Sequence, residues 1–334
     1  MATRRSLLLG GIGTLTSAAL GPRRAAYADP TLQKVKIVIP QSSVFCLNYL
    51  GAKDAGLFAK HGIDLDADPR PFAGFLAGLP SQQCMVDTYS GMDAILKIDE
   101  GVDWAVIGGG LTVVQNVLVR KDAPFKSPDD LRGKKFGTFS TGAGSFKAAR
   151  AAMIDAYKLD VVKDTNLQQV AGPALTKLLE RGDIDAMINI SSLNLAAEAQ
   201  PDKFRVLFSP NEYWKKKTGY PIVWAAPLVA WRSWVDEDRT RAKNFAAAVM
   251  ASFEWLKQPA NLAAAVKSHG TLAGVTTPED VKEYQDWLQH KDMFMTDWSR
   301  KAVDAQWQFL DVAQRTGVIP KVPAQDKYAL FVQS

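Results

Sequence analysis

The chain has 334 residues, of which 47% are hydrophobic and 22% charged, and its formal net charge is +5. A chain of this length and composition can bury a large core and is expected to form about two domains. The first 28 residues contain four arginines and no acid, so 36 basic and 35 acidic residues remain beyond them. That remainder is nearly neutral and has no sustained basic patch, which argues against a nucleic-acid partner.

The N-terminal segment has the layout of an export signal. Two arginines precede an apolar run from Leu7 to Leu20, and Ala26-Tyr27-Ala28 fits the small-residue rule for cleavage. The run is too short to span a bilayer, and Thr3–Leu8 resembles the twin-arginine export motif. We therefore expect residues 1–28 to be a twin-arginine-type signal peptide, with an uncleaved anchor as the alternative. The mature protein should be periplasmic, without stable membrane insertion.

Beyond this segment, short β-rich stretches alternate with helical ones. Lys60-His61-Gly62 gives one helix a cationic last turn followed by glycine, which is a stop signal. The alternation of strands and helices indicates an α/β domain with a largely parallel sheet. Strands are predicted at 34–40, 63–67, 85–89 and 104–107, the last ending at Gly108-Gly109-Gly110, and helices at 45–60, 75–82 and 92–100.

A strand at 113–120 leads out of this unit, and a second α/β unit is predicted to follow. Ser127-Pro128-Asp129-Asp130 has the residues of a helix start, with serine as N-cap, proline next and acids in the first turn. An apolar segment at 222–231 is predicted to return the chain to the first unit. The rest is mainly helical, with an N-cap at Thr277. Further strands are predicted at 135–138, 166–170 and 184–190, and helices at 145–158, 173–181 and 297–316.

The stretch Gly137–Met153 combines a strand, a turn rich in glycine and hydroxyl groups, and a helix start. It fits neither nucleotide template, because Gly142 is not followed by Lys-Ser/Thr and no third glycine completes the dinucleotide pattern. Free N–H groups and the hydroxyls of Ser140, Thr141 and Ser145 would still suit a carboxylate, sulfonate, phosphate or polarised carbonyl. Alternatively, Ser145 only caps the helix and the glycines only form the turn.

Three other polar loops follow predicted strands, namely Gln41-Ser42-Ser43, Thr88-Tyr89-Ser90-Gly91 and Ser191-Ser192-Leu193-Asn194. In open α/β sheets, ligands bind outside the carboxyl ends of the strands. The four loops are divided between the two predicted units. Together they predict one polar cleft between those units.

Residues for catalysis or metal binding are sparse in the sequence. There is no Gly-x-Ser-x-Gly motif, and no histidine lies beside a convincing acid and nucleophile. The three histidines and two cysteines lack metal-ligand spacing, so we expect no catalytic residue, no metal site and no cofactor. Cys46 and Cys84 could pair in an oxidising compartment, but two buried free thiols are the favoured interpretation.

Four segments of the chain resemble a known family, namely Gly51–Leu65, Val119–Lys135, Gly137–Met153 and Ala174–Ala186. Together they are similar to the nitrate/sulfonate/taurine class of periplasmic substrate-binding proteins, which also includes thiamine-precursor binders. The resemblance implies a two-lobe, type II periplasmic-binding-protein fold with two crossing strands as its hinge. Lobe one would comprise residues 30–118 plus 226–334, and lobe two residues 119–225.

The resemblance also implies a function as the solute-binding component of an ABC importer. A small organic ligand would close the lobes by hinge motion. This ligand would be sulfonate- or taurine-like, a carboxylate, or an aromatic or heterocyclic compound. A membrane permease with its ATPase would accept the closed form. The protein would be a monomer, and it would not be an enzyme. The alternatives are a ligand-sensing partner of a membrane receptor and a relative of thiamine-pyrimidine enzymes, whose cysteine-rich motif this chain lacks.

The positions of the strand-end loops supply the expected ligand-binding residues. The segment Gly78–Asp87 departs from the family pattern, which leaves the register of the third loop open. No arginine lies in these loops, so a bidentate sulfonate clamp is not evident. Trp224 could stack on a ligand or pack in the core. The full set is Gln41, Ser42, Ser43, Phe72, Gly74, Thr88, Tyr89, Ser90, Ser140, Thr141, Gly142, Ser191, Asn194 and Trp224.

Overall fold

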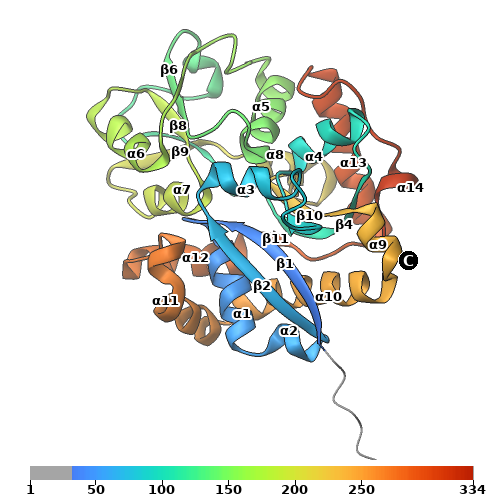
Figure 1. The fold of residues 1–334 in the computed structure, drawn as a ribbon. Coiled ribbons are helices and arrows are strands. Elements are labelled where there is room, and N and C mark those ends of the chain that lie inside the picture. Colours follow the sequence, from blue (N-terminus) through green and yellow to red (C-terminus); the bar gives the residue numbers. More distant parts are fainter. Residues whose placement is uncertain (1–31, 334) are drawn as a thin grey trace, which may run out of the picture. The chain divides into compact units, whose positions relative to one another are not determined.

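A computed structural model describes residues 32–333 and confirms the α/β class (Figure 1). The expected signal peptide, residues 1–28, lies outside the described residues. Three sheets are formed, with strand orders β1–β2, β11–β4–β10–β3 and β7–β6–β8–β5–β9. The strands are β1 (Gln33–Pro40), β2 (Ile63–Arg70), β3 (Val86–Thr88), β4 (Trp104–Leu111), β5 (Val117–Arg120), β6 (Lys135–Thr138), β7 (Asn166–Gln169), β8 (Ala186–Ile188), β9 (Phe204–Phe208), β10 (Ala226–Trp231) and β11 (Phe294–Met295).

The first predicted strand is confirmed as β1, which pairs in parallel with β2 in a register from Gln33↔Ile63 to Pro40↔Arg70. A buried carboxylate links β1 to β3, because Asp87 Oδ2 accepts a hydrogen bond from the Val38 backbone N–H at 3.0 Å. Burial raises the pKa of Asp87 well above the usual carboxyl range. This contact fixes the end of β1 beside the end of β3.

Strand β4 continues through Gly108-Gly109-Gly110, where the sequence predicted its end. The reason is the close approach of neighbouring strands to these glycines. A Cβ atom at Gly109 would overlap the Met295 carbonyl of β11, and one at Gly110 would overlap the Ala226 carbonyl of β10. Glycine is therefore required here to let strands pair closely rather than to end one.

The five-stranded sheet contains every described strand between Val117 and Phe208. In it, β6 runs parallel to β7 and β8, whereas β5 is antiparallel to β8 and β9. The predicted strand at 113–120 is thus shorter, starting at Val117. Strand β9 was not predicted at all. The lobe boundaries expected from the family resemblance stay a prediction.

The two segments that connect the sheets are hydrogen-bonded to each other. The Val113 N–H donates to the Ile222 carbonyl at 2.9 Å, and Gln306 holds the second segment by accepting from the Val223 N–H and donating to the Pro221 carbonyl. Both crossings of the chain are therefore joined in one narrow region.

Local sequence signals explain how many of the helices begin. Ser127 and Thr277 both form capping boxes, as the sequence predicted for their helix starts. The helices of the first half are η1 (Cys46–Leu50), α1 (Gly51–Asp54), α2 (Leu57–Lys60), α3 (Phe72–Gly78), α4 (Gly91–Asp99), η2 (Pro128–Leu131) and α5 (Gly144–Tyr157). Those of the second half are α6 (Gly172–Arg181), α7 (Ser191–Glu198), α8 (Pro210–Thr218), α9 (Arg232–Glu237), α10 (Arg239–Leu256), α11 (Pro259–Ala273), α12 (Pro278–His290), α13 (Arg300–Arg315) and α14 (Gln325–Tyr328).

Three helix predictions need correction. The helix predicted at 45–60 is broken at Gly56, which has a φ of 71°, a left-handed conformation that ends one turn and starts the next. Helix α3 starts at Phe72, three residues earlier than expected, so Phe72 and Gly74 are helical rather than in a loop. The segment Ser191–Asn194 is the first turn of α7 and not a polar loop.

Cys46 and Cys84 are both buried and free, which confirms the favoured interpretation of two unpaired thiols. Across the described part of the chain, no helix has the length and apolar character needed to cross a membrane.

Candidate functional site

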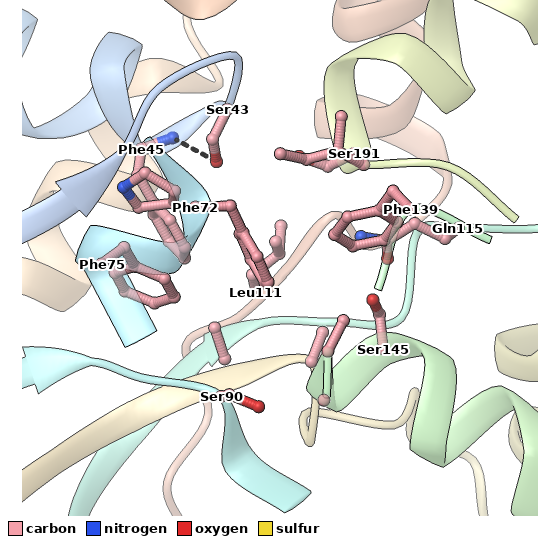
Figure 2. A pocket seen from close by; sticks show the side chains of 16 residues that line it. Ser43, Phe45, Phe72, Phe75, Ser90, Leu111, Gln115, Phe139, Ser145 and Ser191 are labelled. Carbon is pink, nitrogen blue, oxygen red and sulfur yellow. Dashed lines mark hydrogen bonds between the residues drawn. The ribbon is translucent and has the colours of Figure 1, made fainter. Parts of the chain in front are cut away.

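A pocket lies where the carboxyl ends of strands from different sheets meet (Figure 2). Its cavity volume is about 40 Å³, within a hollow of about 400 Å³ that is partly open to solvent. The pocket is bounded by the ends of β1, β3, β4, β6 and β8, the start of β10, and helix α3. The sequence predicted a cleft at these strand ends, but it predicted a polar one, whereas most of the lining residues are apolar. Its lining consists of Pro40, Ser43, Phe45, Phe72, Phe75, Ser90, Leu111, Gln115, Phe139, Ala143, Gly144, Ser145, Ile190, Ser191, Ala225 and Ala226.

One wall of the pocket is aromatic. The Phe72 ring lies 5.7 Å from that of Phe75 and 5.1 Å from that of Phe139, between centroids, and the second pair is edge to face at 74°. Phe45 lines the same space (Figure 2). Four phenyl rings from three segments of the chain thus form an apolar cage, with a geometry that aromatic groups favour.

Four helices begin at the pocket with no side-chain hydrogen bond from their N-cap residues. These residues are Pro71 for α3, Ser90 for α4, Ala143 for α5 and Ile190 for α7. Away from the pocket, α8, α10, α12 and α13 are capped by Ser209, Asp238, Thr277 and Ser299, which accept from first-turn N–H groups, whereas α6, α9 and α11 also begin without a side-chain cap. Uncapped N-termini carry partial positive charge and free donors, which favour an anion or a polar acceptor group.

Two buried polar side chains at the pocket have no partner. Ser90 and Gln115 are only 2% and 4% exposed, yet Ser90 Oγ and Gln115 Oε1 make no hydrogen bond within the described residues. Buried polar atoms of this kind are usually satisfied by another group or by an ordered molecule. Ser145 also directs its hydroxyl into the space (Figure 2).

The lining contains no charged side chain. Lys147, one turn into α5, is paired with Asp93 of α4, and both side chains are less than a fifth exposed. This pair joins the two helices beside the pocket and neutralises the lysine. The lining itself therefore offers helix N-termini, and no cationic side chain, as a source of positive potential.

Four of the residues expected to bind ligand line this pocket, namely Ser43, Phe72, Ser90 and Ser191. The other ten lie outside its lining, and several make contacts within the protein. Tyr89 donates its hydroxyl to the Leu76 carbonyl at 2.9 Å, and Trp224, fully buried, donates Nε1 to the Gln306 carbonyl at 3.0 Å. The ten are Gln41, Ser42, Gly74, Thr88, Tyr89, Ser140, Thr141, Gly142, Asn194 and Trp224.

The sequence-based set left out much of the aromatic wall and part of the polar lining. Phe139 lies inside the glycine-rich stretch, and its position directly after a predicted strand was an available signal. The sequence suggested Ser145 both as a possible hydroxyl donor and as a possible helix cap, and the expected ligand-binding set does not include it. Helix α5 starts at Gly144 with Ala143 as its N-cap, so the Ser145 hydroxyl does not cap the helix and instead lines the pocket. Gln115 lies in the segment after β4, and no motif in the sequence there indicates a binding residue. The other residues missed are Pro40, Phe45, Phe75, Leu111, Ala143, Gly144, Ile190, Ala225 and Ala226.

Residues 46–262 match the family model described as NMT1/THI5 like. The chain belongs to this family. Among curated proteins, no sequence match was found.

Solved structures of this family's fold resemble the protein over most of its length. The periplasmic aliphatic sulphonate binding protein SsuA from Escherichia coli has a TM-score of 0.68 at 17% identity, covering 90% of this chain and 93% of the other. The alkanesulfonate-binding protein SsuA from Xanthomonas axonopodis pv. citri, bound to MOPS, has a TM-score of 0.65 at 15% identity, with coverage of 89% and 96%. These matches establish an α/β periplasmic-binding-protein fold.

An enzyme shares the same fold. The desulfurization enzyme DSZB has a TM-score of 0.57 at 14% identity, covering 89% of this chain and 96% of that one. Within residues 32–333, no cluster of His, Cys, Asp and Glu could hold a metal ion. The cysteine next to the pocket is Cys46, whose thiol donates a hydrogen bond to the carbonyl of the lining residue Pro40. Burial raises the pKa of the Cys46 thiol to about 12. At neutral pH this sulfur is therefore a neutral thiol rather than a nucleophilic thiolate.

Proposed function

We propose that the protein is the solute-binding component of an ABC importer and that it captures a small organic molecule in the pocket of Figure 2. The observation that carries this proposal is the combination of an aromatic pocket wall with unpartnered polar groups of Ser90 and Gln115. Pockets that bind small molecules are mostly apolar, with few polar groups that fix orientation. Family membership and the fold shared with SsuA sulphonate-binding proteins support the same assignment.

The lining favours binding over catalysis. It offers serine hydroxyls but no histidine, cysteine, lysine or carboxylate that could act as a general base or nucleophile. Serine without a base is a weak nucleophile, so these hydroxyls would serve as hydrogen-bond donors and acceptors to a solute. Delivery would then be to a permease with its ATPase, and export to the periplasm would follow the signal sequence of residues 1–28.

Lobe closure would couple binding to delivery. The connecting segments joined by the Val113–Ile222 hydrogen bond would act as the hinge. Contacts between Phe72 and Phe139 and between Lys147 and Asp93 would hold the closed form. A solute that touches both walls binds the closed form better and shifts the population toward it.

A thermal-shift panel of small organic solutes tests the proposal, since a ligand that binds only the native state raises the melting temperature. At least one sulfonate, carboxylate or aromatic solute should stabilise the protein. Ser145→Ala, in the lining, should reduce that shift, whereas Ser268→Ala, exposed on α11, should not. A folded protein that no solute stabilises, or a shift that is equal in both variants, would count against this pocket.

A further inference from the structure

We propose, building on the importer function above, that the pocket takes an aromatic acid, that is, a flat ring bearing a single carboxylate or sulfonate group. Both the shape and the electrostatics of the lining contribute to this inference. The aromatic cage would hold the ring, and the uncapped ends of α4 and α5 would hold the acidic group.

The ring position follows from the phenyl cage. Phe72, Phe75 and Phe139 form a connected chain of tilted and edge-to-face contacts, and Phe45 closes the same space. Aromatic rings attract one another in these orientations beyond the gain from burying apolar area. A planar ligand ring can continue the chain of contacts, whereas a saturated ring of similar volume cannot.

The acidic group belongs at the place where α4 and α5 begin. A Cβ atom at Gly144 would lie 2.9 Å from Ser90 Oγ and 2.7 Å from the Trp224 carbonyl, so the first residue of α5 touches the N-cap of α4. The unpartnered hydroxyl of Ser90 lies at the same point. Two helix N-termini and the Ser90 hydroxyl therefore lie beside each other, with the Trp224 and Ala225 carbonyl oxygens next to them. The donors available to one anionic group here are the first-turn N–H groups of α4 and α5 and this hydroxyl.

The lack of cationic lining limits the ligand to one negative charge. Lys147 is already paired with Asp93, and none of the lining residues is charged. A second buried charge on the ligand would lose its hydration without a partner, which is strongly unfavourable. Dicarboxylates and phosphate monoesters should therefore bind more weakly than monoanions of the same size.

Isothermal titration calorimetry of the purified protein with defined probes tests the inference. Benzoate or benzenesulfonate should bind at least about tenfold more tightly than cyclohexanecarboxylate, benzamide or phthalate. Cyclohexanecarboxylate keeps the charge without the aromatic ring, benzamide keeps the ring without the charge, and phthalate adds a second charge. The benzoate and benzenesulfonate arms show which acidic group is preferred. Equal affinity for any of the three comparison probes would overturn the assignment.

The outcome separates this inference from the importer function. If ethanesulfonate or taurine binds while both aromatic acids fail, the aromatic-acid assignment is wrong and the importer function stands. If a folded protein binds none of these and nothing in a wider solute panel, both are contradicted.

Two variants test the placement of the ligand within the pocket. Phe139→Leu should reduce the preference for benzoate over cyclohexanecarboxylate, whereas Phe331→Leu, which lies in a different groove, should leave it unchanged. Ser90→Ala should weaken benzoate more than benzamide, and it remains informative if Phe139→Leu does not fold. Preferences that are unchanged in Phe139→Leu and Ser90→Ala would overturn the placement.

Discussion

The rings of Phe72 and Phe139 meet edge to face with centroids 5.1 Å apart. Phe72 begins helix α3, which follows strand β2, whereas Phe139 follows strand β6, and β2 and β6 belong to different sheets. This contact closes the aromatic side of the pocket. A double-mutant cycle with Phe72→Leu and Phe139→Leu should give a coupling of about 0.5–1.5 kcal/mol in the free energy of unfolding. The changes for Phe72→Leu and Phe331→Leu, which do not touch, should add. Additive behaviour of the first pair would mean that the contact is absent in solution.

Gly144 is expected to be irreplaceable, because a Cβ atom there would lie 2.7–2.9 Å from the Trp224 and Ala225 carbonyls and Ser90 Oγ. Gly144→Ala should lower the free energy of unfolding by about 1–3 kcal/mol through overpacking and should distort the pocket. Gly142→Ala is the matched control, since its Cβ would meet only Ser140 Oγ at 3.5 Å and Leu76 at 3.9 Å. Chemical denaturation measures both, and equal stability of the two variants would contradict the close packing at α5.

Glu198, at the last turn of α7, should make the protein less stable as pH rises. Burial, and secondarily Glu283, raise the pKa of Glu198 from 4.5 to about 8, although Asn116 and Asn194 donate to its carboxylate. Between these values the folded protein keeps a proton that the unfolded chain has released, so the free energy of unfolding falls as pH rises. The melting temperature should therefore decrease between about pH 5 and pH 8.

Glu198→Gln isolates this effect, because glutamine keeps the shape of the side chain and does not titrate. The variant should have a flatter melting-temperature profile over that pH range than the wild type. Glu100→Gln, at an exposed position, should keep the wild-type slope. A wild-type slope in Glu198→Gln would show that this carboxyl titrates in its ordinary range.

Both cysteines should be unreactive in the native protein. Burial raises the pKa of Cys46 to about 12 and also raises that of Cys84, with Asp87 adding to the second shift. A thiol reagent should modify neither at pH 8 until the protein is unfolded, when two thiols should react. Rapid labelling of the folded protein would show that at least one sulfur is accessible.

Much of the fold could be predicted because its local signals agree with its packing. The strand at 34–40 and the capping sequences at Ser127 and Thr277 formed as predicted. Predictions failed where tertiary contacts outweighed local preference. Serines favour caps and turns, so Ser191-Ser192 suggested a loop, yet they begin α7.

The general position of the pocket could be predicted, but most of its lining could not. Strand ends mark where a cleft forms, whereas the direction of each side chain depends on packing. Tyr89 and Trp224 turn toward carbonyl partners inside the protein, while Phe75 and Gln115 face the pocket. In the sequence, a phenylalanine of the cage looks the same as one in the core, because both are apolar residues at buried positions.

The most direct test of the account is a crystal structure of the protein with the solute that stabilises it most. The account predicts electron density packed against the Phe72 and Phe139 rings on the pocket side, with an acceptor group within hydrogen-bond distance of Ser90 and the start of α5. Density in the groove lined by Lys243, Met250 and Phe331 instead, with this pocket empty, would contradict it.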